Sequence, residues 1–302
     1  MSSSADNRID PRDWMLLGLL SVLWGGSFFF NGVILRELPP LTLVLLRVAL
    51  GAAILLPLLR TYKIALPKGW AGWAPFFAMG LFNNVLPFSL IVFGQTYITS
   101  GLASILNATT PLFAVVIMAV AGEEKAQPRR IAGVVAGVIG VAVLHGDALG
   151  IESRQGIGIL LCLAGAFSYG LAALVSRRLP SRVPPLGTAT FQMMASAAMM
   201  AVVAGVVERP WLLPMPHPTT WLAVLGLAAL STALAYIVFF QILQRSGATN
   251  VMLVTLLIPV TAILLGYLVL GEPISPREVI GALMIASALL LIDGRMLTWF
   301  RR

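Results

Sequence analysis

The side chains of this 302-residue sequence that could do chemistry are mainly amides and hydroxyls set near prolines inside long apolar runs. Asn107 lies four residues before Pro111 within one such run. A proline inside a helix removes one backbone hydrogen bond and frees the carbonyl four residues earlier, which here belongs to Asn107. Amide and carbonyl groups gathered at such a kink can bind a small polar molecule through hydrogen bonds.

The same arrangement occurs again 148 residues later, where Thr255 precedes Pro259. Interrupted helices at matching positions of two halves point to a binding site in carriers. The alternative is a tolerated kink whose carbonyl is satisfied by neighbouring helices. The residues leave both interpretations open.

A second polar cluster holds Asn83 and Asn84, with Ser231 and Thr232 as counterparts and Tyr236 close by. Two adjacent amides cannot both face lipid, because lipid offers neither of them a hydrogen-bond partner. At least one is therefore expected to face the interior, either towards a binding site or as a bond between helices.

Two aromatic residues and one arginine complete the candidates. Trp24 and Tyr169 fall near equivalent points of their apolar runs, where they could line a pocket or simply fill space. Arg47 is the one charge well inside an apolar run, about 10 Å from its start at 1.5 Å per residue. It is either an anchor for a substrate carboxylate or a gate, or a snorkelling arginine tied to helix ends.

Enzymatic and metal chemistry find no support in the charged residues. The twelve Asp and Glu residues fall in tails, turns or helix ends, and so do the two histidines. Because no acid–base pair, nucleophile with a base or metal cluster is predicted at one depth, we expect neither an enzyme nor a bound cofactor or metal. Obligatory proton coupling is weakly supported too, since it generally needs an intramembrane acid or histidine.

Composition places these residues in a lipid bilayer. The chain is 59% hydrophobic and 11% charged, with a mean hydropathy of +0.93, which leaves too little polar surface for a globule of this size. The formal charge of +8 is scattered between apolar runs rather than gathered on one face, so no nucleic-acid partner is predicted.

Ten runs approach the roughly 20 apolar residues that a spanning helix needs. We therefore predict an all-α integral membrane protein with ten transmembrane helices. They are expected at residues 14–35, 40–60, 71–93, 101–121, 129–145, 156–176, 186–207, 219–243, 249–270 and 277–293.

An internal repeat organises these helices. Residues 101–146 align without a gap with residues 249–294, and the turn in each copy carries an acid, a proline and an arginine in the same register. Five helices per copy is an odd number, so the second copy should cross the membrane in the opposite direction, giving two inverted repeats. The expected divisions are a cytoplasmic tail 1–13, a first repeat 14–145, a linker 146–155, a second repeat 156–293 and a basic cytoplasmic tail 294–302.

The basic residues predict the orientation. With the N-terminus inside, fifteen of the 20 Lys and Arg residues fall in inner segments and four in outer segments, while Arg47 lies within a span. Cytoplasmic loops retain Lys and Arg. Both termini are therefore expected in the cytoplasm, with the turn of Glu124 inside and the turn of Glu272 outside.

Several of these features together resemble the EamA-type carriers of the drug/metabolite transporter superfamily, and most of all its bacterial aromatic amino acid exporters of the YddG type. The features are Trp24-Gly25, Pro39-Pro40 followed by Arg47, the Gly-Glu turns at 122–124 and 271–272, and Gly281 after Pro276-Arg277. The resemblance spans residues 14–293 and implies a bacterial inner-membrane location and a central cavity between the two repeats. The cavity residues it implies are Trp24, Asn83, Asn84, Asn107, Pro111, Tyr169, Tyr236 and Pro259.

Residues and resemblance together predict an alternating-access transporter, embedded in lipid and compatible with a monomer. It is expected to export or exchange small amphipathic metabolites such as aromatic or apolar amino acids, without obligatory proton coupling. The alternatives are a translocase for lipids or lipid-linked metabolites and a proton-coupled drug or metabolite exporter.

The orientation can be tested with single cysteines in a Cys162→Ala background. Because the turn of Glu272 is expected outside and the turn of Glu124 inside, an impermeant maleimide added to cells should label Ser275→Cys and leave Lys125→Cys unlabelled. The reverse labelling pattern would overturn the inverted-repeat prediction.

Overall fold

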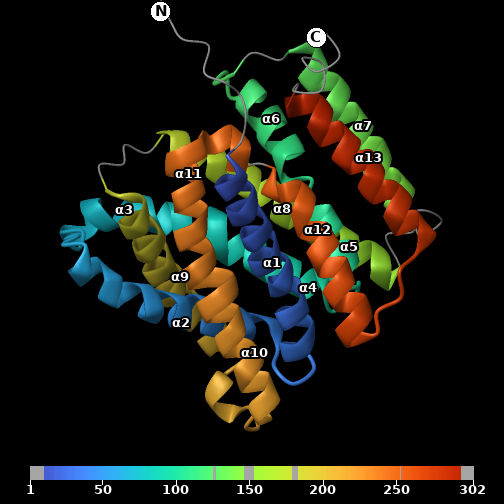
Figure 1. Cartoon of the computed structure of the whole chain (residues 1–302). Coiled ribbons are helices and arrows are strands. Elements are labelled where there is room, and N and C mark those ends of the chain that lie inside the picture. Colours follow the sequence, from blue (N-terminus) through green and yellow to red (C-terminus); the bar gives the residue numbers. More distant parts are fainter. Residues whose placement is uncertain (1–9, 125–126, 146–152, 179–182, 252, 294–302) are drawn as a thin grey trace, which may run out of the picture.

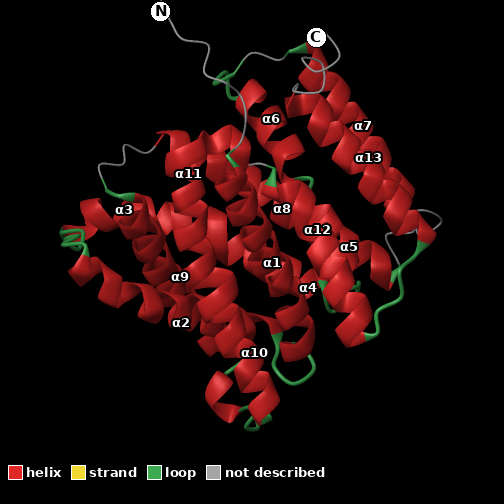
Figure 2. Ribbon diagram, in the orientation of Figure 1, coloured by secondary structure: helices red, strands yellow, loops and turns green. Residues whose placement is uncertain are grey.

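The computed structural model describes residues 10–124, 127–145, 153–178, 183–251 and 253–293. Over these residues the chain consists of helices and loops, without strands (Figure 2). Seven helical segments among them are long and apolar enough to cross a membrane, and Val254–Leu270 is a shorter apolar segment. The all-helical membrane fold is thus confirmed, while the count of ten spans stays a prediction.

The helices of the first half follow one another through short turns, and several begin at a proline. Proline suits the first turn of a helix because the N–H it lacks would have no partner there. The elements are α1 (Pro11–Ile34), α2 (Pro40–Thr61), α3 (Gly69–Gly80), the π-helical η1 (Leu81–Val85), α4 (Leu86–Gly94), α5 (Ser100–Asn107), α6 (Thr110–Val120) and α7 (Pro128–His145).

The second half has a related order. Its elements are α8 (Arg154–Arg178), α9 (Pro185–Val207), the short 3-10 helix η2 (Pro210–Leu212), α10 (Pro218–Ala228), the π-helical η3 (Ala229–Leu234), α11 (Ala235–Val251), α12 (Val254–Leu265), the π-helical η4 (Gly266–Leu270) and α13 (Pro276–Asp293).

Helix α1 crosses the middle of the bundle and contacts α10, α11 and α12 (Figure 1). On one side α2 packs on α9, and on the other α8 packs on α4 and α6. Two large clusters of buried apolar residues fill the interior, one including Leu17 and Ile258 and the other Val44 and Leu227. Figure 1 also shows that α1 begins and α13 ends at the same end of the bundle.

Two π-helical turns occupy equivalent places in the two halves. Residues 81–85 form η1, and residues 229–233, which lie 148 positions later, fall within η3. A π-turn bonds each N–H to the carbonyl five residues back and often marks a functional site. Asn83 and Asn84 lie in η1, and Ser231 and Thr232 lie in η3, so the polar pairs aligned in the sequence also share an unusual backbone.

Two predicted helix boundaries were wrong. Residues 101–121 were expected to form one helix kinked at Pro111, but α5 ends at Asn107 and α6 begins at Thr110, so the proline lies in the first turn of a new helix. A new helix was expected to begin at residue 249, but α11 continues to Val251. Gly247 and Asn250 therefore lie within α11 and do not end it.

Helix α7 packs closely against α13 at one edge of the bundle (Figure 1). A Cβ atom added at Gly133 would come 2.5 Å from Ile292 Cγ1 and 2.9 Å from the backbone oxygen of Ala288. Such a short distance to backbone cannot be relieved by rotating a side chain. Glycine at this position therefore sets the spacing of the two helices.

This contact predicts different effects for the same substitution, glycine to alanine, at two positions. Gly133→Ala should lower the stability of the protein by about 1–3 kcal/mol through overpacking. Gly18→Ala, on a face of α1 where an added Cβ meets no atom within 4 Å, should leave stability unchanged or raise it through better helix propensity. The thermal melting temperature in detergent measures both variants, and equal melting temperatures would contradict the close α7–α13 contact.

Candidate functional site

A cavity of about 490 Å³ lies between the two halves of the bundle. Most of its wall is apolar, with rings and aliphatic side chains from α1, α4, α8, α11 and α12. Its polar and charged lining residues are Ser27, Asn31, Arg47, Asn83, Asn107, Thr110, Tyr169, Ser176, Thr188, Gln192, Ser231, Tyr236 and Thr255. This volume falls within the usual range for sites that bind small molecules.

Five of the eight residues that the sequence singled out line this cavity. They are Trp24, Asn83, Asn107, Tyr169 and Tyr236. The aromatic members pack against further rings of the wall, because the Trp24 ring lies 5.5 Å from Phe239 and the Tyr236 ring is stacked 6.1 Å from Phe240, measured between ring centroids. A flat apolar group can therefore find ring surfaces in this part of the cavity.

The other three, Asn84, Pro111 and Pro259, lie behind the wall. Asn84 is fully buried, and its Nδ2 donates to Ser196 Oγ at 3.0 Å, which ties η1 to α9. Pro111 and Pro259 are buried, although their chain neighbours Thr110 and Ile258 do line the cavity. These three residues thus shape the helices around the site without lining it.

Of the two interpretations that the sequence left open for the carbonyl of Asn107, its hydrogen bonding favours a kink satisfied within the protein. The carbonyl accepts a hydrogen bond of 2.8 Å from the hydroxyl of Thr110, so the helix break satisfies its own backbone. The side-chain Oδ1 of Asn107, in contrast, is buried and has no hydrogen-bond partner among the described residues. The polar group available at this point is therefore the amide side chain.

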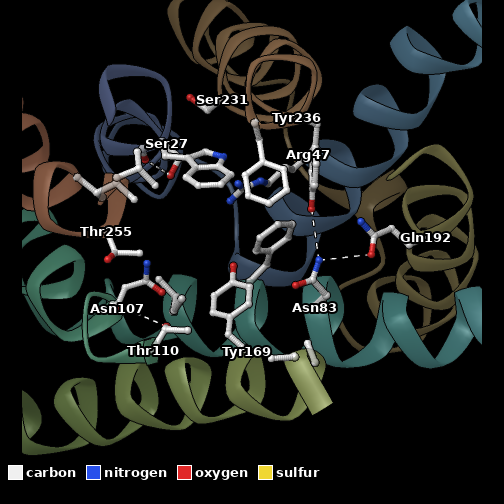
Figure 3. Close-up of a pocket in the computed structure, with 18 of the residues that line it drawn as sticks. Ser27, Arg47, Asn83, Asn107, Thr110, Tyr169, Gln192, Ser231, Tyr236 and Thr255 are labelled. Atoms are coloured by element: carbon white, nitrogen blue, oxygen red, sulfur yellow. Dashed lines mark hydrogen bonds between the residues drawn. The ribbon is translucent and has the colours of Figure 1, made fainter. Parts of the chain in front are cut away.

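The polar residues form two groups on opposite sides of the cavity. Figure 3 shows Asn107, Thr110 and Thr255 on one side and Asn83 and Gln192 on the other, with Tyr169 between them. In the second group Asn83 Nδ2 donates to Gln192 Oε1 at 3.3 Å and to the hydroxyl of Tyr236 at 3.5 Å. Both sides of the cavity thus offer polar groups to a bound molecule.

Gln192 was missed by the sequence analysis, although a signal was present. Counted from the prolines that open their helices, Arg47 is the eighth residue of α2 and Gln192 the eighth residue of α9. These two helices are equivalent in the repeat. An alignment that follows the opening prolines Pro40 and Pro185 is offset by 145 residues rather than 148, and it pairs the buried arginine with a buried amide.

Arg47 is buried at 7% exposure and lines the cavity. Its Nε donates to Thr232 Oγ1 at 3.2 Å, and its guanidinium carbon lies 3.7 Å above the ring centroid of Phe88. A snorkelling arginine would carry its charge to the surface. The structure instead holds this charge inside the bundle.

Three carboxylates cap helix N-termini at one end of the bundle, which we call the capped end. Glu37 accepts hydrogen bonds from the first residues of α10, Glu208 from α2 and Glu272 from α5, as the contacts His217 N–Glu37 (2.7 Å), Thr42 N–Glu208 (2.6 Å) and Ser100 N–Glu272 (2.9 Å) show. Helix N-termini carry partial positive charge and unpaired N–H groups. Each cap therefore joins two segments that are distant in the chain.

Hydrogen bonds also close the cavity at the capped end. Asn31 Nδ2 donates to Gln95 Oε1 at 2.8 Å, and Gln95 Nε2 donates to the carbonyl of Phe28 at 3.0 Å. Asn31 lines the cavity but is only 1% exposed, whereas Ser176, towards the other end, is exposed. The cavity is thus closed at the capped end and open at the opposite end.

Ion pairs join helices at the open end. Arg177 pairs with Glu124 at 3.0 Å, and Arg245 pairs with Asp13 at 3.0 Å. The hydrogen bond and charge of Arg130, together with those of Arg177, hold the pKa of the Glu124 carboxyl below its ordinary value. This acid therefore stays ionised at neutral pH.

A helical bundle with several membrane-crossing segments and a central cavity open at one end is the architecture of a multi-pass membrane carrier. The model of the EamA-like transporter family matches residues 12–145 and again residues 156–293. The chain belongs to this family. Its members are transporters.

Relatives match nearly the whole chain, and a solved structure shares its fold. The chain is 26% identical to the Bacillus subtilis "Uncharacterized transporter YoaV", covering 92% of this chain and 96% of that protein. It is 27% identical to the Salmonella typhimurium "Probable amino-acid metabolite efflux pump", covering 92% and 93%. A crystal structure of a protein with 23% identity shares the fold, with a TM-score of 0.65 over 92% of this chain and 96% of that one.

The neighbouring amides of η1 predict different chemical accessibility. In a Cys162→Ala background, Asn83→Cys faces the cavity and Asn84→Cys faces α9. A small water-soluble thiol reagent should react with the first variant at least about tenfold faster than with the second, because only an accessible thiolate reacts. Labelling rates measured by mass spectrometry check this, and equal rates would place both residues on the same side of the wall.

Proposed function

We propose that the protein exports or exchanges small amphipathic metabolites, above all aromatic or other apolar amino acids, across a bacterial inner membrane by alternating access. The observation that carries this proposal is the cavity that opens at one end only and combines aromatic walls with amide and hydroxyl groups. The rings of Trp24 and Phe239 suit an apolar side chain. The amide oxygen of Asn107 suits an ammonium group.

Two features support the amino-acid class. The volume of about 490 Å³ is large enough for one such molecule but small against the reach of a membrane lipid. A relative over nearly the full length carries the name of an amino-acid metabolite efflux pump. We include in this proposal that the chain resembles aromatic amino acid exporters of the YddG type, which would favour aromatic amino acids as substrates.

We also propose ten spans arranged as two inverted five-helix repeats, over residues 14–145 and 156–293, with both termini in the cytoplasm. The equivalent π-turns η1 and η3 support the repeat. Helix α1 begins and α13 finishes on the same side of the bundle, which supports an even number of crossings (Figure 1). In this orientation the capped end faces outwards, and the cavity opens to the cytoplasm.

The lining also supports transport without obligatory proton exchange. No Asp, Glu or His side chain lines the cavity among the described residues. Proton-driven carriers generally use such a group within the membrane to pick up and release the proton. Transport down the gradient of the solute needs none.

Counterflow in liposomes tests the function and the coupling. Vesicles with purified protein and loaded with unlabelled phenylalanine should take up labelled phenylalanine with no pH gradient and no membrane potential, because exchange through alternating states needs no other driving force. Protein-free vesicles are the control. Uptake that appears only when protons flow would replace this proposal with a proton-coupled exporter, and uptake of lipid analogues instead would indicate a lipid translocase.

A further inference from the structure

We propose that Arg47 binds the carboxylate of the transported solute and that the cavity therefore selects molecules with a carboxylate next to an apolar body. This inference rests on the proposed function, because it assigns a substrate group within the same cavity.

The guanidinium of Arg47 is held in place with most of its hydrogen-bonding capacity unused. It has five N–H donors, and one of them, on Nε, bonds to Thr232 Oγ1 at 3.2 Å. The hydroxyl of Thr232 is itself fixed, since it donates to the carbonyl of Leu227 at 2.9 Å. The described residues offer the two terminal nitrogens of Arg47 no hydrogen-bond partner.

The charge of Arg47 also lacks a counter-ion among the described residues. It forms no ion pair, and the cavity lining contains no Asp or Glu. The guanidinium carbon of Arg47 lies 3.7 Å from the centroid of the Phe88 ring. The face of an aromatic ring attracts a cation but does not neutralise its charge. An unpaired charge inside a membrane protein is costly. A carboxylate from the solute would supply both the missing charge and the missing acceptors.

The internal repeat shows that a structural role at this position does not need a charge. Gln192, the counterpart of Arg47, accepts a hydrogen bond of 3.3 Å from Asn83 in η1, whereas Arg47 donates to Thr232, the counterpart of Asn84, in η3. Each side chain thus bonds to the π-turn of the other half. The same equivalence holds four residues later, where Ser196 bonds to Asn84, while a Cβ at Gly51 would come 2.9 Å from Thr232 Cγ2. A neutral amide thus joins α9 to η1, and the charge of the residue that joins α2 to η3 needs a further explanation.

Arginine is suited to this role because its planar fork matches the two oxygens of a carboxylate. The aromatic surfaces near Trp24 and Phe239 lie in the same cavity and can take the apolar body. A solute bound in this way would have its carboxylate at α2 and its side chain among the rings. Amides and amines that lack the carboxylate should bind poorly.

The repeat itself suggests the variant for the test. Arg47→Gln copies the residue at the equivalent position, removes the charge and keeps a donor for Thr232. Arg47→Lys keeps the charge, and Arg60→Gln, at the exposed end of the same helix, is the matched control. Binding of L-phenylalanine and L-phenylalaninamide to the purified protein is measured by isothermal titration calorimetry, with the melting temperature of each variant as a check on folding.

The wild type and Arg60→Gln should bind the acid about 10- to 100-fold more tightly than the amide. Arg47→Gln should lose this preference, because its affinity for the acid falls while its affinity for the amide stays the same. Arg47→Lys should retain a preference for the acid. An Arg47→Gln protein that folds and still prefers the acid overturns the proposal. If Arg47→Gln does not fold, a folded Arg47→Lys protein that prefers the amide overturns it.

A second pair of probes separates this inference from the proposed function. The acid 4-phenylbutyrate and its amide differ in the same group but lack the ammonium of an amino acid. If the wild type binds phenylbutyrate through Arg47 and ignores phenylalanine, the amino-acid function fails and the role of Arg47 stands. If the wild type prefers neither acid over its amide, the role of Arg47 fails whatever is transported.

Discussion

Inside a bilayer no water is available to pair with backbone and side-chain polar groups, and this constraint explains much of the structure. Where α5 ends at Asn107, the hydroxyl of Thr110 takes the carbonyl that the helix break leaves open. Where η3 widens the helix, the hydroxyl of Thr232 takes the carbonyl of Leu227. Irregular backbone is tolerated at these points because a side chain replaces the missing partner. The irregular segments then become the places where polar groups can face a cavity.

The same constraint explains why part of the fold could be predicted from the sequence. Apolar runs of about 20 residues indicate spanning helices because a helix of that length crosses the lipid with its backbone hydrogen bonds satisfied internally, and the repeated Gly-Glu turns indicate the duplication. The π-turns and the break before Thr110 could not be predicted, since they depend on side-chain hydrogen bonds that a hydropathy pattern does not register. Asn83 and Asn84 illustrate the limit. The sequence requires one of them to face inwards, but only the local winding of η1 places Asn83 in the cavity and Asn84 against Ser196.

The carboxylate caps were also beyond the sequence, because each links residues 166 or more positions apart. The caps and the ion pairs lie at opposite ends of the bundle. Glu37, Glu208 and Glu272 each satisfy N–H groups at a helix start, so the capped end is tied together by bonds of good geometry to fixed backbone. The open end is tied by partly exposed ion pairs such as Arg245–Asp13, and exposed pairs of this kind contribute little to stability.

Two identical repeats would give a cavity with two equivalent polar corners and no preferred direction for the solute. The two halves of the wall differ at several positions, among them Asn83/Ser231 and Asn107/Thr255, and the pairing of Arg47 with Gln192 is the difference that involves a charge. An uncompensated charge is felt more strongly in a low-dielectric interior than in water, so this difference outweighs the neutral ones in orienting a charged group. In the proposed alternating-access mechanism Arg47 stays on α2 in both states, so the charged corner stays with the same helix. Within that proposal the duplication provides the two states, and the departure from it at Arg47 provides the selectivity.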